Sequence, residues 1–303
     1  MRTHRSERKT VEVKPEKTMN VPNVSIKQLL EAGVHLGHKT LRWNPKMKNF
    51  IFGEKNSIHI LDLTQTVTLI KKALMEVHKC ISSGGKILIV STKKQASETV
   101  LKVASETDQF YVNYRWLGGM LTNWKTIQNS IKRLKKLEQD LSKEDIGFTK
   151  KEIIKLGKER DKLKRSLGGI SEMKKVPNML FVIDTNVESL AIKEAAKLNI
   201  PIAAVLDSNS DPDGIDYPIP GNDDARRSIN LYCELLKETI LDAKKYIAKE
   251  KFEEKKPKKA EEKKPKKAEE KKPKKAEEKK PKKAEEKKPK KAEEKIKKVS
   301  SKK

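Results

Sequence analysis

The stretch from residue 115 to residue 126, RWLGGMLTNWKT, combines two tryptophans, a Gly-Gly pair and two cations. Glycine pairs hold phosphates in nucleotide enzymes, but this one lacks the spacing of a Rossmann G-x-G-x-x-G or a Walker GxxxxGK[ST] motif, and no apolar strand directly precedes it. The pattern instead predicts a turn, in which Thr122 would cap the helix that follows. The mixture of cation and aromatic at Arg115, Trp116 and Trp124 is typical of nucleic-acid-binding surfaces.

A second basic and aromatic stretch, HKTLRWNPKMKNF, runs from residue 38 to residue 50. Two interpretations stay open for it: a solvated loop, or a loop that contacts nucleic-acid phosphates. The side chains that would make such contacts are Lys39, Arg42, Trp43, Lys46 and Lys48. An HxxH pair, His35 and His38, stands at the start of this stretch. A metal site would need further ligands, and neither cysteine is near in sequence, so a structural role is favoured.

Residues 207 to 224, DSNSDPDGIDYPIPGNDD, are crowded with acids. They follow a predicted strand, where open α/β sheets place ligands. The position of Gly214 and the missing terminal Glu do not match an EF-hand calcium loop. We therefore expect a structural loop, with an incidental Mg²⁺ as the alternative and no other cofactor. No Ser-His-Asp or Cys-His arrangement can be assembled, so the sequence predicts no catalytic site.

Apolar runs alternate with amphipathic segments between Val24 and Ile247. The runs KILIVST, NMLFVID and IPIAAVLD are typical of strands that are covered on both faces. Helical periodicity predicts helices at 24–33, 64–85, 93–107, 186–199 and 223–247. The segment at 49–61 predicts a hairpin that turns at Gly53 to Asn56. Alternation of this kind predicts a doubly wound α/β fold, with helices on both faces of a parallel sheet.

The segment from Thr122 to Lys175 contains no strand-like run. Apolar residues recur at steps of three and four in two blocks, which predicts two amphipathic helices in an antiparallel, coiled-coil-like hairpin. The part from 125 to 175 holds 16 Lys and Arg against 8 Asp and Glu. Most of the basic excess of the predicted folded part therefore lies on this arm, where Lys125, Lys132 and Arg133 are candidates for contact with a polyanion.

The chain as a whole has a formal net charge of +27. Residues 255 to 303 repeat the octad KKPKKAEE five times and hold 25 Lys and 10 Glu, which leaves +12 for residues 1 to 254. Such an excess predicts a polyanionic partner, either nucleic acid or an anionic membrane surface. The repeats contain no apolar residue larger than alanine, so we expect a disordered tail. Compaction of DNA or RNA is an additional interpretation of the tail.

The chain contains no run of 18 apolar residues, which predicts no membrane span. Its first twenty residues lack the apolar core of a secretory signal. Cys80 and Cys233 lie far apart in helix-like patterns, so we expect both to be reduced. These observations predict a cytosolic protein.

Four long motifs resemble one known family, the bacterial small-subunit ribosomal protein S-two family. They are LLEAGVHLGHKTLRWNPKMKNFIFG, YRWLGGMLTNWKTI, PNMLFVIDTNVESLAIKEAAKLNIPIAAVLDSN and DPDGIDYPIPGNDDARRSI. The resemblance covers roughly residues 22 to 247 in order. It implies a flavodoxin-like, three-layer α/β domain with an inserted helical hairpin, no enzymatic activity, and a place in the cytoplasmic ribosome. It also implies binding to small-subunit rRNA between head and body, contact with neighbouring ribosomal proteins, help in anchoring the S-one protein, and no homo-oligomer or membrane partner.

The candidate rRNA-binding residues combine the resemblance with side-chain chemistry. They are Arg42, Trp43, Lys46, Lys48, Arg115, Trp116, Asn123, Lys125, Lys132, Arg133 and Arg226. The expected division of the chain is a flexible extension at 1–21, an α/β domain at 22–121 and 176–250, the arm at 122–175, and a disordered tail at 251–303. Two alternatives stay open: a scaffold that binds protein, and a nucleotide-binding enzyme on a flavodoxin-like sheet.

Overall fold

The computed structural model describes residues 21–142 and 149–254. The expectations for the N-terminal extension, for the loop between the two arm helices and for the KKPKKAEE tail therefore lie outside the described residues, at 1–20, 143–148 and 255–303. Cys80 and Cys233 are free cysteines, as the sequence predicts. Within the described residues, no helix is long and apolar enough to cross a membrane.

The central sheet has five parallel strands in the order β5-β4-β6-β7-β8. Their bounds are β4 (Ile87–Val90), β5 (Phe110–Val112), β6 (Met179–Ile183), β7 (Ile202–Leu206) and β8 (Tyr217–Pro220). Numbered along the chain, these strands lie in the order 2-1-3-4-5, which is the flavodoxin-like arrangement. The predicted fold class is confirmed.

Two strands of this sheet were not predicted from the sequence. β5 has only three residues, which is too short for an apolar run to be recognised. β8 reads Tyr-Pro-Ile-Pro and was placed inside the acidic loop. Proline cannot donate to a ladder hydrogen bond, so it is confined to edge strands, and β8 is indeed the edge of the sheet.

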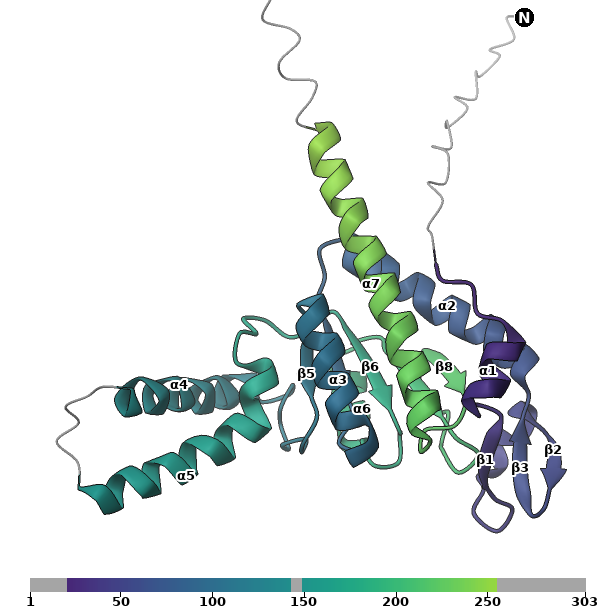
Figure 1. Cartoon of the computed structure of the whole chain (residues 1–303), viewed down its shortest axis with the longest axis horizontal. Coiled ribbons are helices and arrows are strands. Elements are labelled where there is room, and N and C mark those ends of the chain that lie inside the picture. The colour runs from purple at the N-terminus through teal and green to yellow at the C-terminus, as the bar shows by residue number, and fades with distance from the viewer. Residues whose placement is uncertain (1–20, 143–148, 255–303) are drawn as a thin grey trace, which may run out of the picture. The chain divides into compact units, whose positions relative to one another are not determined.

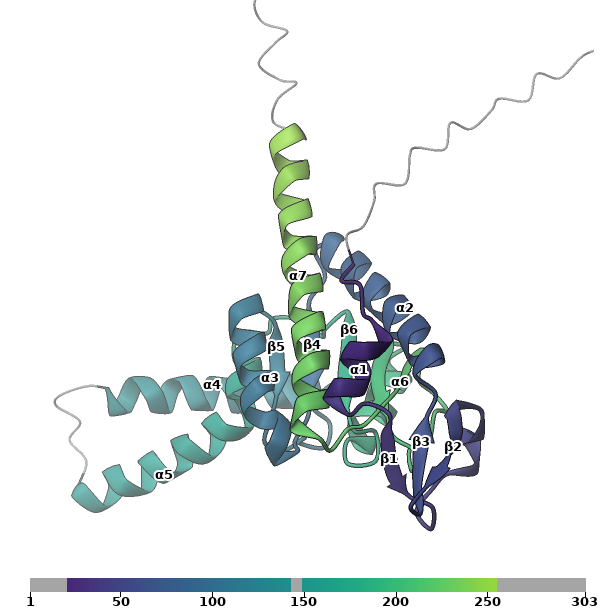
Figure 2. The same ribbon diagram turned by 45° about the vertical axis from the view of Figure 1, so that its right-hand side comes forward.

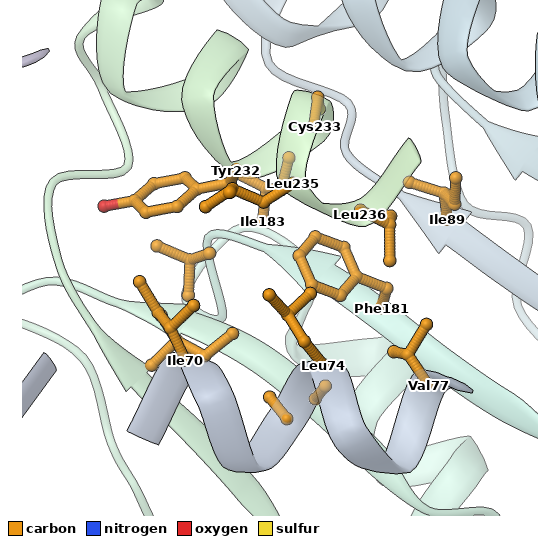
Figure 3. Packing of buried hydrophobic residues seen from close by; sticks show 14 of the residues in the cluster. Ile70, Leu74, Val77, Ile89, Phe181, Ile183, Tyr232, Cys233, Leu235 and Leu236 are labelled. Carbon is orange, nitrogen blue, oxygen red and sulfur yellow. The ribbon is translucent and has the colours of Figure 1, made fainter. Parts of the chain in front are cut away.

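Alternate residues of the strands face two separate apolar layers, as the period of two requires. On one face, Ile89, Phe181 and Val205 pack with α1 (Ile26–Ala32), α2 (Leu63–Ser82), α3 (Lys94–Thr107) and α7 (Arg226–Glu254). Figure 3 shows this layer, with side chains of α2 and α7 meeting those of β6. The sheet is therefore buried between helices on this side.

The residues between them point to the opposite face. There Leu88, Val90 and Val182 pack with α6 (Ser189–Lys197) and with the base of the arm. α3 and α6 cover different faces because the chain adds strands to β4 first in one direction and then in the other, and parallel crossovers are right-handed. The result is the expected three-layer architecture.

The arm is inserted where the chain crosses from β5 to β6. It consists of α4 (Trp124–Leu141) and α5 (Lys150–Leu167), which lie side by side and extend away from the sheet (Figures 1 and 2). The short 3-10 helix η2 (Gly168–Ile170) then leads back to the sheet. Ile127, Ile131 and Leu134 of α4 join the second apolar layer, so the base of the arm is continuous with the core.

A small antiparallel sheet stands beside the main one. It has the order β1-β3-β2, from β1 (Leu36–Lys39), β2 (Ile51–Lys55) and β3 (Ile58–Leu61), with the 3-10 helix η1 (Pro45–Phe50) before β2. The predicted hairpin at 49–61 is confirmed, but its turn is at Asn56 and Ser57. Both have positive φ angles, 56° and 59°, as the two-residue type I′ turn requires.

Candidate nucleic-acid interface

Three lysines form a row on the outer face of α4. Lys125, Lys132 and Lys136 are all exposed, while Ile127 and Ile131 on the opposite side of the helix are buried. At 1.5 Å per residue the row is about 16 Å long. Within residues 21–142 and 149–254, none of the three lysines forms an ion pair. Lys125 and Lys132 were predicted from the sequence, and Lys136 was missed.

α5 carries a second, longer cationic row. Its members recur at alternating steps of four and three residues, and all are exposed: Lys151, Lys155, Lys158, Lys162 and Arg165. Steps of this kind keep side chains on one face of a helix. No member of the row has an ionic partner in the described part of the chain. We call these five residues the α5 row, and the three lysines above the α4 row.

The acids of α5 are already engaged. Glu159 pairs with Arg133 across the hairpin at 3.2 Å, and Asp161 pairs with Arg160 at 2.7 Å. Glu152 closes the capping box at the start of the helix. The Arg133 guanidinium, predicted as a contact with RNA, is thus committed to an interhelical ion pair.

The residues predicted at the root of the arm have different surroundings. Arg115 is exposed, and no described residue forms an ion pair with it. Asn123 is exposed at the N-cap of α4, where its side chain accepts a hydrogen bond from the Thr126 hydroxyl. Trp116 is only 8 % exposed and lies in the second apolar layer, so its ring is not on the surface for stacking with a base.

The Gly-Gly turn surrounds a carboxylate of the protein itself. Oε1 of Glu194, on α6, accepts from the Trp116 indole at 3.1 Å and from the Gly119 amide at 2.8 Å. Oε2 accepts from the Leu121 amide at 2.9 Å and from the amide and hydroxyl of Thr122 at 3.1 and 3.2 Å. The expectation that Thr122 caps α4 is therefore wrong, because its side chain is hydrogen-bonded to Glu194.

Glu194 remains ionised in this turn. Burial works against the charged form, but the hydrogen bonds from Leu121, Trp116, Thr122 and Gly119 outweigh it and lower the pKa of the Glu194 carboxyl. Gly119 has a φ of +80°, which glycine adopts without strain. The backbone amides of Gly119, Leu121 and Thr122 thus converge on one anion, as in the anion-binding concavities called nests.

The basic loop before β2 is held against the acidic loop. The backbone N–H of Asn44 donates a hydrogen bond to the Ser208 carbonyl, and Met47 is fully buried beneath the loop. The Lys46 ammonium lies 3.0 Å from Asp211 and also contacts Asp213. Lys46 therefore forms ion pairs within the protein, at its surface.

The other predicted residues of this loop are free of such pairs. Arg42 and Lys48 are exposed, and neither forms an ion pair with any residue that the structure describes. Trp43 is 39 % exposed, and the centroid of its ring lies 5.4 Å from the centroid of the His59 ring. Arg42 also lines a surface hollow of about 760 Å³ together with Leu41, His38 and Asp224.

Charged side chains meet at the carboxyl edge of the main sheet. The Lys93 ammonium lies 2.8 Å from both Asp184 and Asp223 and 2.6 Å from Asp224. Burial and the Asp184 carboxylate raise the pKa of Asp223 to about 7, against the opposing effect of Lys93. Arg226 is exposed at the first turn of α7, directly after this network.

His38, Asp207 and Asp224 form the one group in the described residues whose ligand atoms could hold a metal ion; these atoms lie within 4.8 Å of one another. Nδ1 of His38 is 2.8 Å from Asp207, and this hydrogen bond raises the pKa of the imidazole. Nε2 lies 3.4 Å from Asp224. Two ligands of a tetrahedral zinc ion, each at about 2.0–2.1 Å, are separated by about that distance. An imidazole ligand suits Zn²⁺ better than Mg²⁺, the ion considered from the sequence.

Comparison with known proteins decides the family. The sequence model of the family "Ribosomal protein S2" matches residues 29–243. A small ribosomal subunit protein uS2 of Sinorhizobium medicae is 57 % identical over 224 residues, which are 74 % of this chain and 88 % of that protein. The chain belongs to the ribosomal protein S2 family. The uS2 proteins of Chelativorans sp. and Brucella suis are 58 and 59 % identical over the same share of this chain and cover 84 and 88 % of their own lengths.

As a member of the S2 family, the chain is a structural protein of the small ribosomal subunit and not an enzyme. The alternative of a flavodoxin-like nucleotide enzyme is thereby set aside. The sequence analysis singled out neither Glu194 nor Lys136, and it named no member of the α5 row. The sequence did contain a signal for Glu194: in the helix Ser189–Lys197, this glutamate lies on the buried face, together with Ala191 and Ala195.

Proposed function

We propose that this S2-family chain binds small-subunit rRNA through two basic surfaces, the arm and the loop at residues 38–50, and helps to anchor the S-one protein. Its place would be the cytoplasmic ribosome. The α/β domain, at 22–121 and 176–250, would act as a rigid frame, and the arm at 122–175 as the part that reaches the RNA.

The observation that carries this proposal is the pair of unpartnered cationic rows on the arm. Eight exposed cations of the α4 and α5 rows have no ionic partner among the described residues. A polyanion such as rRNA would neutralise them and release its condensed counterions, which favours binding. Because the rows follow regular helices, they suit the repeating phosphates of a backbone better than a base sequence.

The loop at residues 38–50 supplies the second surface. Arg42 and Lys48 offer charge, and Trp43 offers a ring against which a base or sugar would stack. We leave Trp116 out of the proposed interface because it is buried, and Lys46 and Arg133 count as weaker contacts because each is already paired.

Anchoring of S-one would use apolar rather than charged surface. Leu41 and Phe52, on the small sheet and its preceding loop, are 95 % and 81 % exposed. Exposed apolar side chains of this size are typical of sites that bind another protein. Leu41 also lines the 760 Å³ hollow described above.

Sedimentation of cell lysate through a sucrose gradient tests the proposal. The full chain and a version that ends at Glu254 are followed across the fractions at low and high salt. We expect both to sediment with small subunits and to resist high salt. If neither does so, rRNA binding within the subunit is refuted, and a scaffold that binds protein alone becomes the better account. Co-purification of rRNA with the isolated chain, read as the ratio of absorbance at 260 and 280 nm, separates these two cases directly.

A further inference from the structure

The arm leaves the sheet through two connections, and the first is organised by one side chain. Residues 116–122 directly precede α4, and their donors converge on Glu194. Glu194 belongs to α6, which packs on the sheet through Ala191 and Ala195. The contact therefore joins the start of the arm to a helix of the rigid α/β frame.

Glu194 has the features of a positioning group rather than of a surface charge. It is 6 % exposed, and in the described part of the chain no cation forms an ion pair with it. Its charge is balanced entirely by five hydrogen bonds from four residues, three of which are backbone amides. Because amides are fixed to the chain path, an anion that binds three of them determines that path over residues 119–122.

The second connection leaves little freedom either. At Gly169, in η2, a Cβ atom would lie 2.1 Å from the Tyr111 carbonyl oxygen of β5. The end of α5 is thus in tight backbone contact with the edge strand. The second connection is thus held by packing. The direction of α4 then depends on the packing of Ile127, Ile131 and Leu134 against the core and on the hydrogen-bonded turn before the helix.

We propose that Glu194 is a positioning residue for the arm: by holding the turn at 116–122, it fixes the angle at which the arm leaves the sheet. The functional consequence rests on the proposed binding of rRNA. Two surfaces on one rigid frame bind a shared partner more tightly than two surfaces that move independently, because less freedom is lost on binding. Glu194 would therefore contribute to RNA affinity without touching RNA.

Distance measurements between spin labels test the positioning. Labels are placed at Gln139→Cys on α4 and Lys72→Cys on α2, both exposed positions, in a full chain with Cys80→Ala. We expect a narrow distance distribution in the otherwise unchanged chain. Glu194→Gln replaces one acceptor oxygen with an amide that faces donors, and we expect it to shift or broaden the distribution.

Two control variants separate positioning from lost charge and from lost stability. Glu98→Gln removes the same charge from an exposed site on α3, where the side chain forms no hydrogen bond or ion pair with any residue that the structure describes. Val182→Ala weakens the same apolar layer but leaves the turn intact. We expect both to keep the narrow distribution. If Glu194→Gln fails to fold, Trp116→Phe combined with Thr122→Val removes two donors and keeps the carboxylate.

Binding to small-subunit rRNA supplies the second readout. We expect Glu194→Gln to weaken it about tenfold, and Val182→Ala to leave it unchanged at a temperature where both are folded. A distribution in Glu194→Gln that superimposes on the unchanged chain would overturn the proposal, as would equal broadening in Val182→Ala. Absence of rRNA binding by the unchanged chain would refute the proposed function instead, and the distances would still decide the role of Glu194.

Discussion

The α4 row allows the proposed RNA contact to be tested quantitatively. Changing Lys125, Lys132 and Lys136 together to Gln removes three exposed cations that form no ion pair with any described residue. Each phosphate contact contributes about 0.7 to 0.9 to the slope of log K against log salt, so three contacts contribute roughly 2 to 2.7. The unchanged chain should bind more tightly than the triple variant, and the ratio of their affinities should fall roughly 20- to 40-fold between 50 and 200 mM salt.

The assay is equilibrium binding of the full chain to small-subunit rRNA at four or more salt concentrations. The matched control changes Arg133, Lys135 and Lys164 to Gln, which lowers the net charge equally but removes cations that are already paired with acids on the arm. We expect a much smaller change in slope for this control. Equal slopes for both variants would refute the reasoning, because binding would then depend on net charge and not on the unpaired row.

Three further outcomes follow from the geometry. Glu194→Gln should lower the free energy of unfolding by about 2–4 kcal/mol at neutral pH. Because folding lowers the pKa of Glu194 from 4.5, the difference in stability between the two proteins is present above pH 4.5 and disappears as the pH falls through the folded pKa. Denaturation at a series of pH values measures this difference. Gly169→Ala should lower the free energy of unfolding by about 3 kcal/mol, because the added Cβ would clash with the Tyr111 carbonyl oxygen. Gly157→Ala, in open space within α5, should raise it by up to about 1 kcal/mol, and urea unfolding compares the two variants. Zinc chloride should raise the Tm of the full chain but not of His38→Ala, and an equal rise in both would exclude His38 as a ligand.

Elements with strong periodicity could be predicted from the sequence alone. The apolar runs that became β4, β6 and β7 are buried at every position, and α2 keeps Ile70, Leu74, Val77 and Ile81 on one face. Burial on both faces produces a continuous run, and burial on one face of a helix produces steps of three and four. Both signals are local in sequence, which is why they could be recognised without a structure.

The missed features depend on contacts that are distant in sequence. β5 and β8 are strands because their neighbours offer ladder partners, while three residues and two prolines give little local preference. Trp116 is 78 positions from Glu194, so no local pattern links the tryptophan to its acceptor. The same holds at the candidate interface. The sequence shows that Arg133 is a cation, but its ion pair with Glu159 can be seen only in the folded structure.

The α5 row has an unfavourable cost for the free protein. Like charges at steps of three and four on a helix destabilise it by about 0.2–0.5 kcal/mol per pair, so the four successive pairs of this row cost roughly 1–2 kcal/mol in total. Each acid on α5 that would relieve the repulsion is engaged elsewhere, Glu152 in the cap, Glu159 with Arg133 and Asp161 with Arg160. A solvated helix has no need of such an arrangement, since alternating Glu and Lys would stabilise it. A polyanion that lies along the row would replace this repulsion with attraction, and this is the physical reason for the proposal that RNA binds to the arm.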